Sequence, residues 1–440
     1  MGKDSIHRVM MMKRILSIFL LGCATAAAGA QEAAVTLDAC RRAAVERSPL
    51  SARQALAGEK RKAEDRATSS SLLPQLEIQA QGSYQNEVPK LPTDFPIPVT
   101  MDLPKDQYRA TVELNQVIYA GHSVRNTKRL HAATAEVETA SLAVQLDRLR
   151  DRINRTYLGI LLTNKRLEVN RLMRETLESS LRTVTARVQQ GTATGAQQAS
   201  LAARMLELNQ ERIELSGERA KNITALAELT GMEITEETLF AIPAVPDEPA
   251  AAGGAHAPYR DRSELKLYAE QRNLLEAQNR MLNSRSNPQL SLFASGGYGR
   301  PGYDFFDRNF SPMAIGGLRF RLPLTSWDAT QKEKRVNRVA GRDIDQQQRD
   351  FERNVSIEAA QYLVQIERLQ EVIRLDPTLV EAWAVVRQQA QAQFEQGVIT
   401  ATDYLTEFNN EAAARVNAEV NALRLVEAWV EYQAARGIYN

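Results

Sequence analysis

The 440-residue sequence predicts a mainly α-helical protein with a smaller β component, built as a duplicated strand–strand–long-helix repeat. Three observations indicate this fold class. Charged residues make up 25% of the chain and aromatic residues only 6%, a balance that favours long helices over a large globular core. Short motifs recur in the same order at a spacing of 206 or 214 residues, nearly half the chain. Segments with alternating apolar and polar residues precede each long helical stretch.

The duplication is visible in matched motifs of the two halves. The eleven residues 74–84 (PQLEIQAQGSY) and 288–298 (PQLSLFASGGY) share six identities. Farther along, Gly191 and Gly397 each follow a glutamine and lie 206 residues apart. The final glycines of the two halves, at positions 231 and 437, keep the same spacing. The same order of strand, turn and helix end, with one spacing shared by the turn and the helix end, indicates a true repeat rather than chance likeness between helices.

The domain organisation follows from this repeat. Residues 1–30 are an expected signal peptide, residues 31–241 the first repeat, and residues 259–440 the second. The stretch 242–258 is rich in Pro, Ala and Gly and is predicted to be a linker. Each repeat is expected to hold an opening helix, two strands, a helix of some sixty residues, a Gly turn and a shorter helix.

The helical segments carry a heptad pattern. Opening helices are expected from about 37 to 71 and from about 262 to 286. The long helix of the first repeat, about 124–190, is on the order of 100 Å long at ~1.5 Å per residue. Its apolar residues alternate spacings of four and three, as in a coiled-coil seam: Leu142, Leu146, Leu149, Ile153, Tyr157 and Ile160. Pro377 is expected to kink or briefly break the second long helix.

Four strand-like segments alternate apolar with polar residues. The charged side chains on their polar faces, predicted to line a lumen, are Glu77, Arg109, Glu113, Arg319 and Arg321. Strands of about ten residues with this pattern are typical of an outer-membrane barrel wall, and also of a soluble hairpin packed on a helix. Four strands cannot close around an aqueous lumen, so a barrel needs strands from several copies. Eight strands would leave little lumen, whereas twelve would leave a pore.

The N-terminus predicts export. A basic start and a short apolar run lead to small residues that end at Ala30, which favours signal cleavage between Ala30 and Gln31. Residues 20–23 (LLGC) allow an alternative, a lipobox whose Cys23 is acylated and becomes the first mature residue. Cleavage before Gln31 leaves Cys40 as the only cysteine, so no intrachain disulfide is available.

This layout resembles the TolC-type outer-membrane efflux and secretion channel family. The matching segments are 71–76 (SLLPQL), 115–121 (NQVIYAG) and the Gly turns 188–191 (VQQG) and 394–397 (FEQG). The likeness covers nearly all of the expected mature chain. It implies a homotrimer in the outer membrane, with a twelve-stranded β-barrel continued by a periplasmic α-helical coiled-coil tunnel. It also implies a periplasmic adaptor, an inner-membrane transporter and outer-membrane lipid as partners.

The resemblance further implies a gate at the periplasmic tip, formed by the turns at Gly191 and Gly397. Asp403 matches an acidic position of that tip, and Gln197 is its equivalent in the first repeat. Thr406 stands where the family has a second acidic position, and a basic residue near the Gly is replaced by Ile399. An Asp in the first turn of a helix is also a favourable cap, so a purely structural role is the alternative. Phe394 is expected to plug the opening by bulk.

The composition and motifs argue against other classes. A net charge of +1 gives no pull toward nucleic acid. The four histidines show no metal-ligand spacing, no Ser/His/Asp or Cys/His set appears, and no cofactor motif is present, so the protein is not expected to be an enzyme. The runner-up is an exported periplasmic coiled-coil adaptor or scaffold, although the paired amphipathic strands have no use in a helical rod. The exported substrate is not specified by the sequence.

Overall fold

The computed structural model describes residues 34–88, 104–246, 260–304 and 309–439. The expected signal peptide, with Cys23, Ala30 and Gln31, and most of the predicted linker lie outside the described residues. In the part of the chain that is described, none of the helices combines the length and the apolar character needed to cross a membrane.

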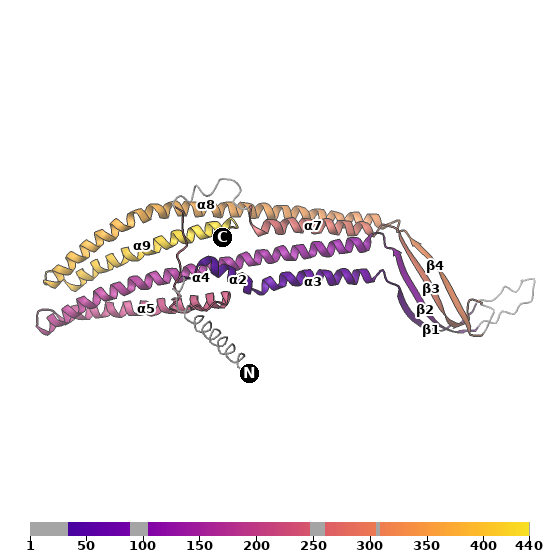
Figure 1. The fold of residues 1–440 in the computed structure, drawn as a ribbon, viewed down its shortest axis with the longest axis horizontal. Helices are drawn as coiled ribbons and strands as arrows, with labels where there is room; N and C mark the ends of the chain where they lie inside the picture. Colours follow the sequence, from indigo (N-terminus) through magenta and orange to yellow (C-terminus); the bar gives the residue numbers. More distant parts are fainter. Residues whose placement is uncertain (1–33, 89–103, 247–259, 305–308, 440) are drawn as a thin grey trace, which may run out of the picture.

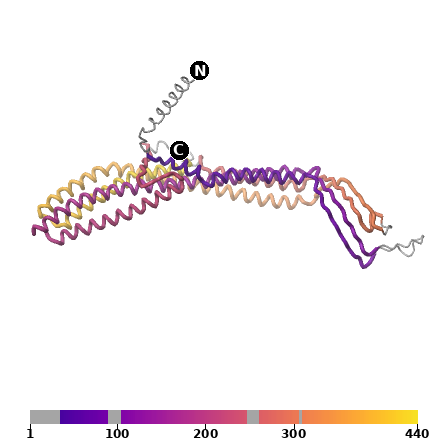
Figure 2. Tube along the Cα trace, turned by 60° about the horizontal axis from the view of Figure 1, so that its bottom comes forward, coloured from indigo at the N-terminus to yellow at the C-terminus, as the bar shows by residue number. Residues whose placement is uncertain are grey.

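The molecule is an elongated rod of helices with a sheet at one end (Figure 1). Two long helices, α4 (Ser123–Gln189) and α8 (Ser326–Glu395), run along most of it and turn back as α5 (Gly195–Thr230) and α9 (Ala401–Ala435). The other elements are α2 (Leu37–Arg47), α3 (Pro49–Ser70), α7 (Ser263–Ser284), β1 (Gln75–Tyr84), β2 (Asp106–Tyr119), β3 (Gln289–Arg300) and β4 (Ser311–Arg321). Seen in a second direction, the sheet is bent away from the line of the helices (Figure 2).

Each half of the chain has the predicted order of elements, which confirms a mainly helical fold with a duplicated strand–strand–long-helix repeat. The opening helix of the first half, however, is not continuous from 37 to 71. It is interrupted at Ser48, whose ψ of 131° is extended. Pro49 excludes the helical conformation at the residue before it and has no N–H to donate, so a new helix starts there. By contrast, α8 continues through Pro377 without interruption, so the predicted break is absent.

The coiled-coil seam predicted on the first long helix is buried. Leu142, Ile153, Tyr157 and Ile160 are essentially inaccessible to solvent, and Leu149 packs at the edge of the same core. The return helix contributes Leu201 and Leu208, which are also buried and lie seven residues apart, as in a heptad. The core around the α4 seam also holds side chains of α2, α5 and α9, and α8 packs along α9 in the second half.

Near the middle of the rod, two short extended segments of the chain pair with each other beside the helices. Val35 pairs with the chain around Phe240 through two main-chain hydrogen bonds, Val35 N to Leu239 O and Ala241 N to Val35 O. The Tyr157 hydroxyl lies 2.6 Å from both Val35 O and Ala241 O, so α4 holds this segment directly. Cys40 packs in the same core as a free thiol, and its burial raises its pKa to about 11.

The four strands form one antiparallel sheet in the order β1-β2-β3-β4. Within it, β2 of the first repeat pairs directly with β3 of the second, so the two repeats share one continuous sheet. Near the helices the register shifts between Val117 and Tyr119, which leaves Ile118 as an extra residue in β2. The outer edges of β1 and β4 have no partner strand within the described sheet.

Candidate functional site

One face of the sheet carries most of its charged side chains. Glu77 lies opposite Glu113, Arg109 opposite Gln81, and Arg319 opposite Ser291. Because alternate residues of a strand point to opposite faces, this register brings every predicted lumen-facing charge to the same face. They are Glu77, Arg109, Glu113, Arg319 and Arg321. Gln, Ser, Thr and Asn side chains fill most of the positions between them.

A cavity of about 310 Å³ lies on this polar face. Arg109, Glu113 and Arg319 line it together with Phe293. The Arg319 guanidinium carbon lies 4.9 Å above the centre of the Phe293 ring, a cation–π contact that holds the arginine against the wall. Both charge signs therefore meet on one concave, wettable surface.

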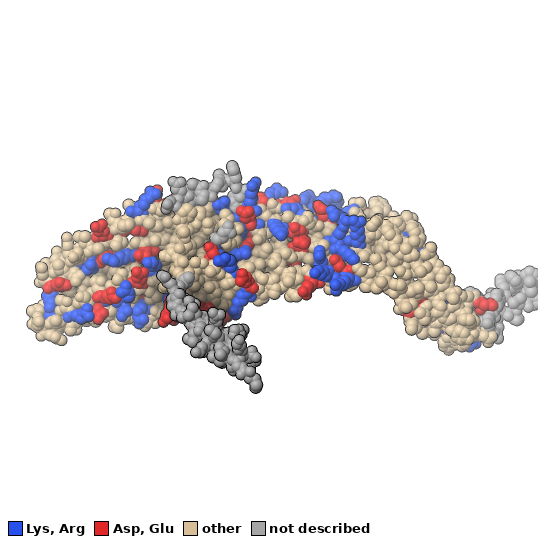
Figure 3. Space-filling model, viewed as in Figure 1, with Lys and Arg blue, Asp and Glu red and all other residues tan. Residues whose placement is uncertain are grey.

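The opposite face of the sheet is apolar and faces solvent in the isolated chain. Ile78 is 80% exposed although it is a large aliphatic residue. Further exposed apolar side chains at positions of the same face are Leu76, Tyr84, Tyr108, Val112, Tyr298, Leu318 and Phe320. A contiguous apolar surface of this kind needs a partner other than water. In the view of Figure 3 the sheet is almost free of Lys, Arg, Asp and Glu.

The far end of the rod is formed by two matched helix turns. Gly191 and Gly397 adopt left-handed backbone conformations, with φ of 74° and 77°. In each turn the next residue donates its N–H to a carbonyl five positions earlier, Thr192 to Arg187 and Val398 to Gln393. This is the Schellman arrangement, which glycine permits because it has no Cβ. The two glycines, which are equivalent in the repeat, therefore have the same turn geometry.

The helices that leave these turns begin with capping boxes. The Asp403 carboxylate accepts hydrogen bonds from Thr400 N at 3.0 Å and Thr400 Oγ1 at 2.7 Å, and these bonds lower the pKa of Asp403. Gln197 holds Thr194 in the same way in the first repeat. Asp403 is thus a helix cap in each single chain, and its role at a gate rests on how copies assemble.

Phe394 does not occupy the position expected of a plug. Its side chain is only 2% exposed and stacks on the Tyr404 ring at 5.2 Å between centroids. The Tyr404 hydroxyl in turn lies 2.9 Å from Ser180 Oγ on α4. Phe394 therefore belongs to the core that joins the two hairpins, because an aromatic ring gains more by packing there than by projecting into water.

An arginine that the sequence analysis did not single out links the two turns. Arg187, in the last turn of α4, donates from Nη1 to the main-chain oxygen of Phe394 at 2.8 Å and from Nη2 to Thr192 O at 3.4 Å. Its equivalent in the second repeat is the uncharged Gln393, so a positively charged side chain is present at this position only in the first turn. Comparison of the repeats position by position would have revealed this difference.

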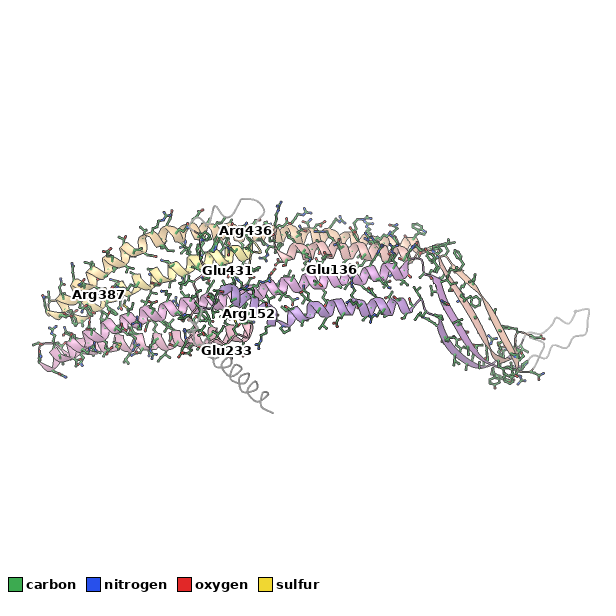
Figure 4. The ribbon with its side chains drawn as sticks, in the orientation of Figure 1. Glu136, Arg152, Glu233, Arg387, Glu431 and Arg436 are labelled. Atoms are coloured by element: carbon green, nitrogen blue, oxygen red, sulfur yellow. The ribbon has the colours of Figure 1, made fainter. Side chains whose placement is uncertain are left out.

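A second ionic contact stabilises the second hairpin near the same end. Arg387, labelled in Figure 4, binds the buried Glu411 carboxylate, which also accepts from Arg415 at 2.8 Å. Two cations on one carboxylate satisfy its buried charge, as a buried acid requires.

At mid-length, Glu431 on α9 is the acid with the most perturbed environment. Burial raises its pKa to about 7, and the nearby Asp151 carboxylate adds to the shift. Arg155 opposes the shift, and Glu427 and Glu358 add to it. Within the described ranges, no group of three or more His, Cys, Asp or Glu side chains is placed to hold a metal ion.

The comparisons with known proteins agree with this geometry. No protein-family model matches the sequence, and a search of curated proteins finds no match. Solved structures do match. The CmeC outer membrane channel of Campylobacter jejuni aligns with a TM-score of 0.67 at 15% identity, over 91% of this chain and 85% of that chain. The outer membrane protein VceC of Vibrio cholerae aligns with 0.66 at 14% identity, over 92% and 97%.

A third match is the MtrE outer membrane channel of Neisseria gonorrhoeae in its open state, with a TM-score of 0.65 at 16% identity, over 91% of this chain and 89% of that chain. The chain has the TolC-type outer-membrane channel fold. The fold of TolC-type channels accounts for both surfaces described above, the two-faced sheet and the paired hairpin turns. It was the fold expected from the strand and turn motifs of the sequence.

Proposed function

We propose that this chain is one subunit of a passive outer-membrane duct that serves efflux or secretion. Three copies would form a twelve-stranded barrel, and their helices would continue it as a tunnel into the periplasm. The observation that supports this most directly is the sheet register, which gathers most of the charged side chains on one face and most of the large apolar ones on the other. Such a sheet suits a wall with lipid outside and water inside.

The free sheet edges support assembly from several copies. Unpaired N–H and C=O groups at an edge are not tolerated against lipid, so each edge needs another strand. The chain supplies an even number of alternating strands, from β1 to β4. The β4 edge of one copy can therefore pair with β1 of the next while the antiparallel alternation continues around a closed ring. Twelve strands leave a water-filled lumen.

The turn ends of the hairpins are proposed to face the periplasmic partners. Val398 lies at the second turn and is 69% exposed despite being apolar. An exposed apolar side chain at the end of a long rigid hairpin suits contact with another protein. We propose a periplasmic adaptor there, with an inner-membrane transporter behind it, and Asp403 and the Gly turns as parts of the closed gate.

The proposal can be tested on full-length protein purified in detergent, by its oligomeric state in SDS and its conductance in planar bilayers. An SDS-resistant trimer that dissociates on heating, together with stepwise conductance in planar bilayers, is the expected result. A monomer in detergent that does not conduct would overturn the proposal and favour the alternative, an exported coiled-coil adaptor or scaffold.

A further inference from the structure

A groove at the junction of the sheet and the helices has one apolar wall and one positively charged wall. It has a volume of about 660 Å³ and lies between the end of α3, the end of β2 and the start of α4. Toward the sheet its walls are apolar, with Leu72, Ile118 and Tyr119. Toward the helices its walls carry four cations, Arg61, Arg125, Lys128 and Arg129. We call this feature the junction groove.

The junction groove opens on the apolar side of the sheet. Tyr119 lies opposite Leu290 in the β2–β3 register, and Leu290 belongs to the apolar face. The Ile118 bulge adds a further exposed apolar side chain there. Figure 3 shows Lys and Arg gathered over the helix ends that border the uncharged surface of the sheet. The apolar face and the cations therefore form one continuous surface.

The cations of the junction groove have no acidic partners among the residues that the structure describes. Arg125, Lys128 and Arg129 occupy one face of α4 at spacings of three and one, and among the described residues none of them forms an ion pair. The only carboxylate in the lining is Asp65, which lies 3.2 Å from His131 Nδ1. An uncompensated cluster of like charges is favourable only when an anion can approach it.

The second repeat has paired cations near the sheet. There, Lys332 pairs with Asp328 on α8 at 2.7 Å, and Arg285 pairs with Glu333 at 2.9 Å. By the 206-residue spacing of the repeats, Lys128 and Arg129 correspond to Lys334 and Arg335, and Lys332 is a paired cation three residues nearer the start of α8 than Arg335. Lys332 is therefore a cation near the sheet whose charge is already compensated on its own helix.

We propose that the junction groove binds the headgroup phosphate of an anionic phospholipid, whose acyl chains lie along the apolar face of the sheet. This inference rests on the proposed function, since it requires the sheet to be embedded in the outer membrane. A free phosphate or an acidic peptide would use the cations but would leave Leu72, Ile118 and Tyr119 uncovered. A phospholipid covers both parts of the groove, because its negatively charged headgroup and its acyl chains belong to one molecule, just as the cations and the apolar wall belong to one groove. The groove lies between α3 and α4 of one chain, away from the β4 edge.

The experiment uses the full-length detergent-purified trimer and native mass spectrometry. Dioleoyl phosphatidylglycerol and dioleoyl phosphatidylcholine, which have the same chains, are added in equal amounts. The wild type is expected to retain the anionic lipid preferentially. Each removed cation is expected to weaken retention by about fivefold, so Lys128→Gln with Arg129→Gln should abolish most of the preference. Lys332→Gln is the matched control and should leave it unchanged, because Lys332 is already paired.

Two further measurements distinguish a lipid phosphate from free phosphate, and failure of the lipid site from failure of the proposed channel function. Inorganic phosphate at millimolar concentration should not displace the lipid, and displacement would identify a simple phosphate site instead. Equal lipid retention by the wild type and the double variant would overturn the inference. If that happened while the trimer remained heat-modifiable and conducting, the proposed channel function would stand and only the lipid site would fail.

Discussion

Arg187 donates a hydrogen bond to the main-chain oxygen of Phe394, and the two residues lie at the ends of different long helices. The bond ties the turn of the first hairpin to the turn of the second. The Phe394 oxygen also accepts from Gly397 N at 3.0 Å, so Arg187 adds a second, charged donor to a carbonyl in the last turn of α8. Any movement that separates the two hairpins at this end has to break the Arg187 bond.

The first prediction concerns this bond. Arg187→Gln should shift the duct toward open states, since loss of a charged hydrogen bond costs about 1–2 kcal/mol, roughly a factor of ten in the closed-to-open ratio. Single-channel recordings in planar bilayers measure the open fraction. Arg182→Gln is the control, because Arg182 is exposed and pairs only with Glu178 on its own helix. Equal open fractions in wild type and Arg187→Gln would show that the bond does not restrain opening.

The second prediction concerns Asp403. If three copies bring their turns together at the axis, Asp403→Asn should lower cation selectivity, because a ring of carboxylates is removed. Hydrogen bonds from Thr400 lower the pKa of Asp403, so in each chain the charge persists below the usual titration range of Asp. The capping contribution of the charged form is present at neutral pH and is lost as the pH falls through that lowered pKa. Reversal potentials across a salt gradient, from neutral to acidic pH, provide the measurement.

Gln197→Glu is the counterpart of this experiment, because it places a charge at the equivalent position of the first repeat. It should raise cation selectivity. Unchanged selectivity in Asp403→Asn, with the trimer intact, would leave Asp403 as a helix cap alone.

The third prediction concerns Phe394. Because the Phe394 side chain is buried, Phe394→Ala should weaken the packing between the two hairpins rather than remove a plug. Large-to-small changes of a buried aromatic cost about 3–5 kcal/mol. The variant should therefore show faster proteolysis at the turns, while Val398→Ala, at an exposed neighbour, should not. A clean rise in conductance without proteolytic sensitivity would restore the plugging role expected from the sequence.

The fourth prediction uses neighbouring positions of β1. Ile78→Arg places a charge on the apolar face, which costs about 2–4 kcal/mol near the middle of a bilayer. The heat-modifiable trimer recovered from outer membranes should fall sharply. Gln79→Arg is a matched control, since Gln79 lies opposite Thr111 on the polar face and adds one more charge to a surface that already holds several. Equal loss in both variants would contradict the assignment of the two faces.

The fifth prediction concerns pH. The pKa of Glu431 is about 7 in the folded chain, above its ordinary value, because burial penalises the charged form. The folded state therefore holds this proton more tightly than the unfolded state. Stability is full below the ordinary pKa of Glu, falls as the pH rises toward 7, and is reduced by about 1–3 kcal/mol above it.

Glu431→Gln should remove this penalty and flatten the stability profile between the ordinary pKa of Glu, 4.5, and the folded pKa of about 7. The temperature at which the trimer dissociates in SDS is the readout. Glu175→Gln, on an exposed pair with Arg171, is the control. An unchanged profile in Glu431→Gln would mean that other groups set the pH response.

Local patterns in the sequence determined the repeat, the order of elements and the two faces of each strand. The heptad positions of α4, such as Leu142 and Ile153, are buried as their spacing predicts, because periodicity depends only on helix geometry. The glycines of the two turns were recognisable because a left-handed residue at a helix end favours glycine whatever surrounds it.

Contacts between distant segments were decided only by the tertiary structure. The sequence suggested Phe394 as a plug, but its ring is buried against Tyr404, and whether a side chain points inward depends on the neighbouring helix. The Arg187 bond, the β2–β3 pairing and the junction groove likewise join residues far apart in the chain, which spacing alone does not specify. The sequence fixes which face of an element is apolar, because that follows from its own period. Which faces meet depends on the packing of all elements together, and only the folded chain decides it.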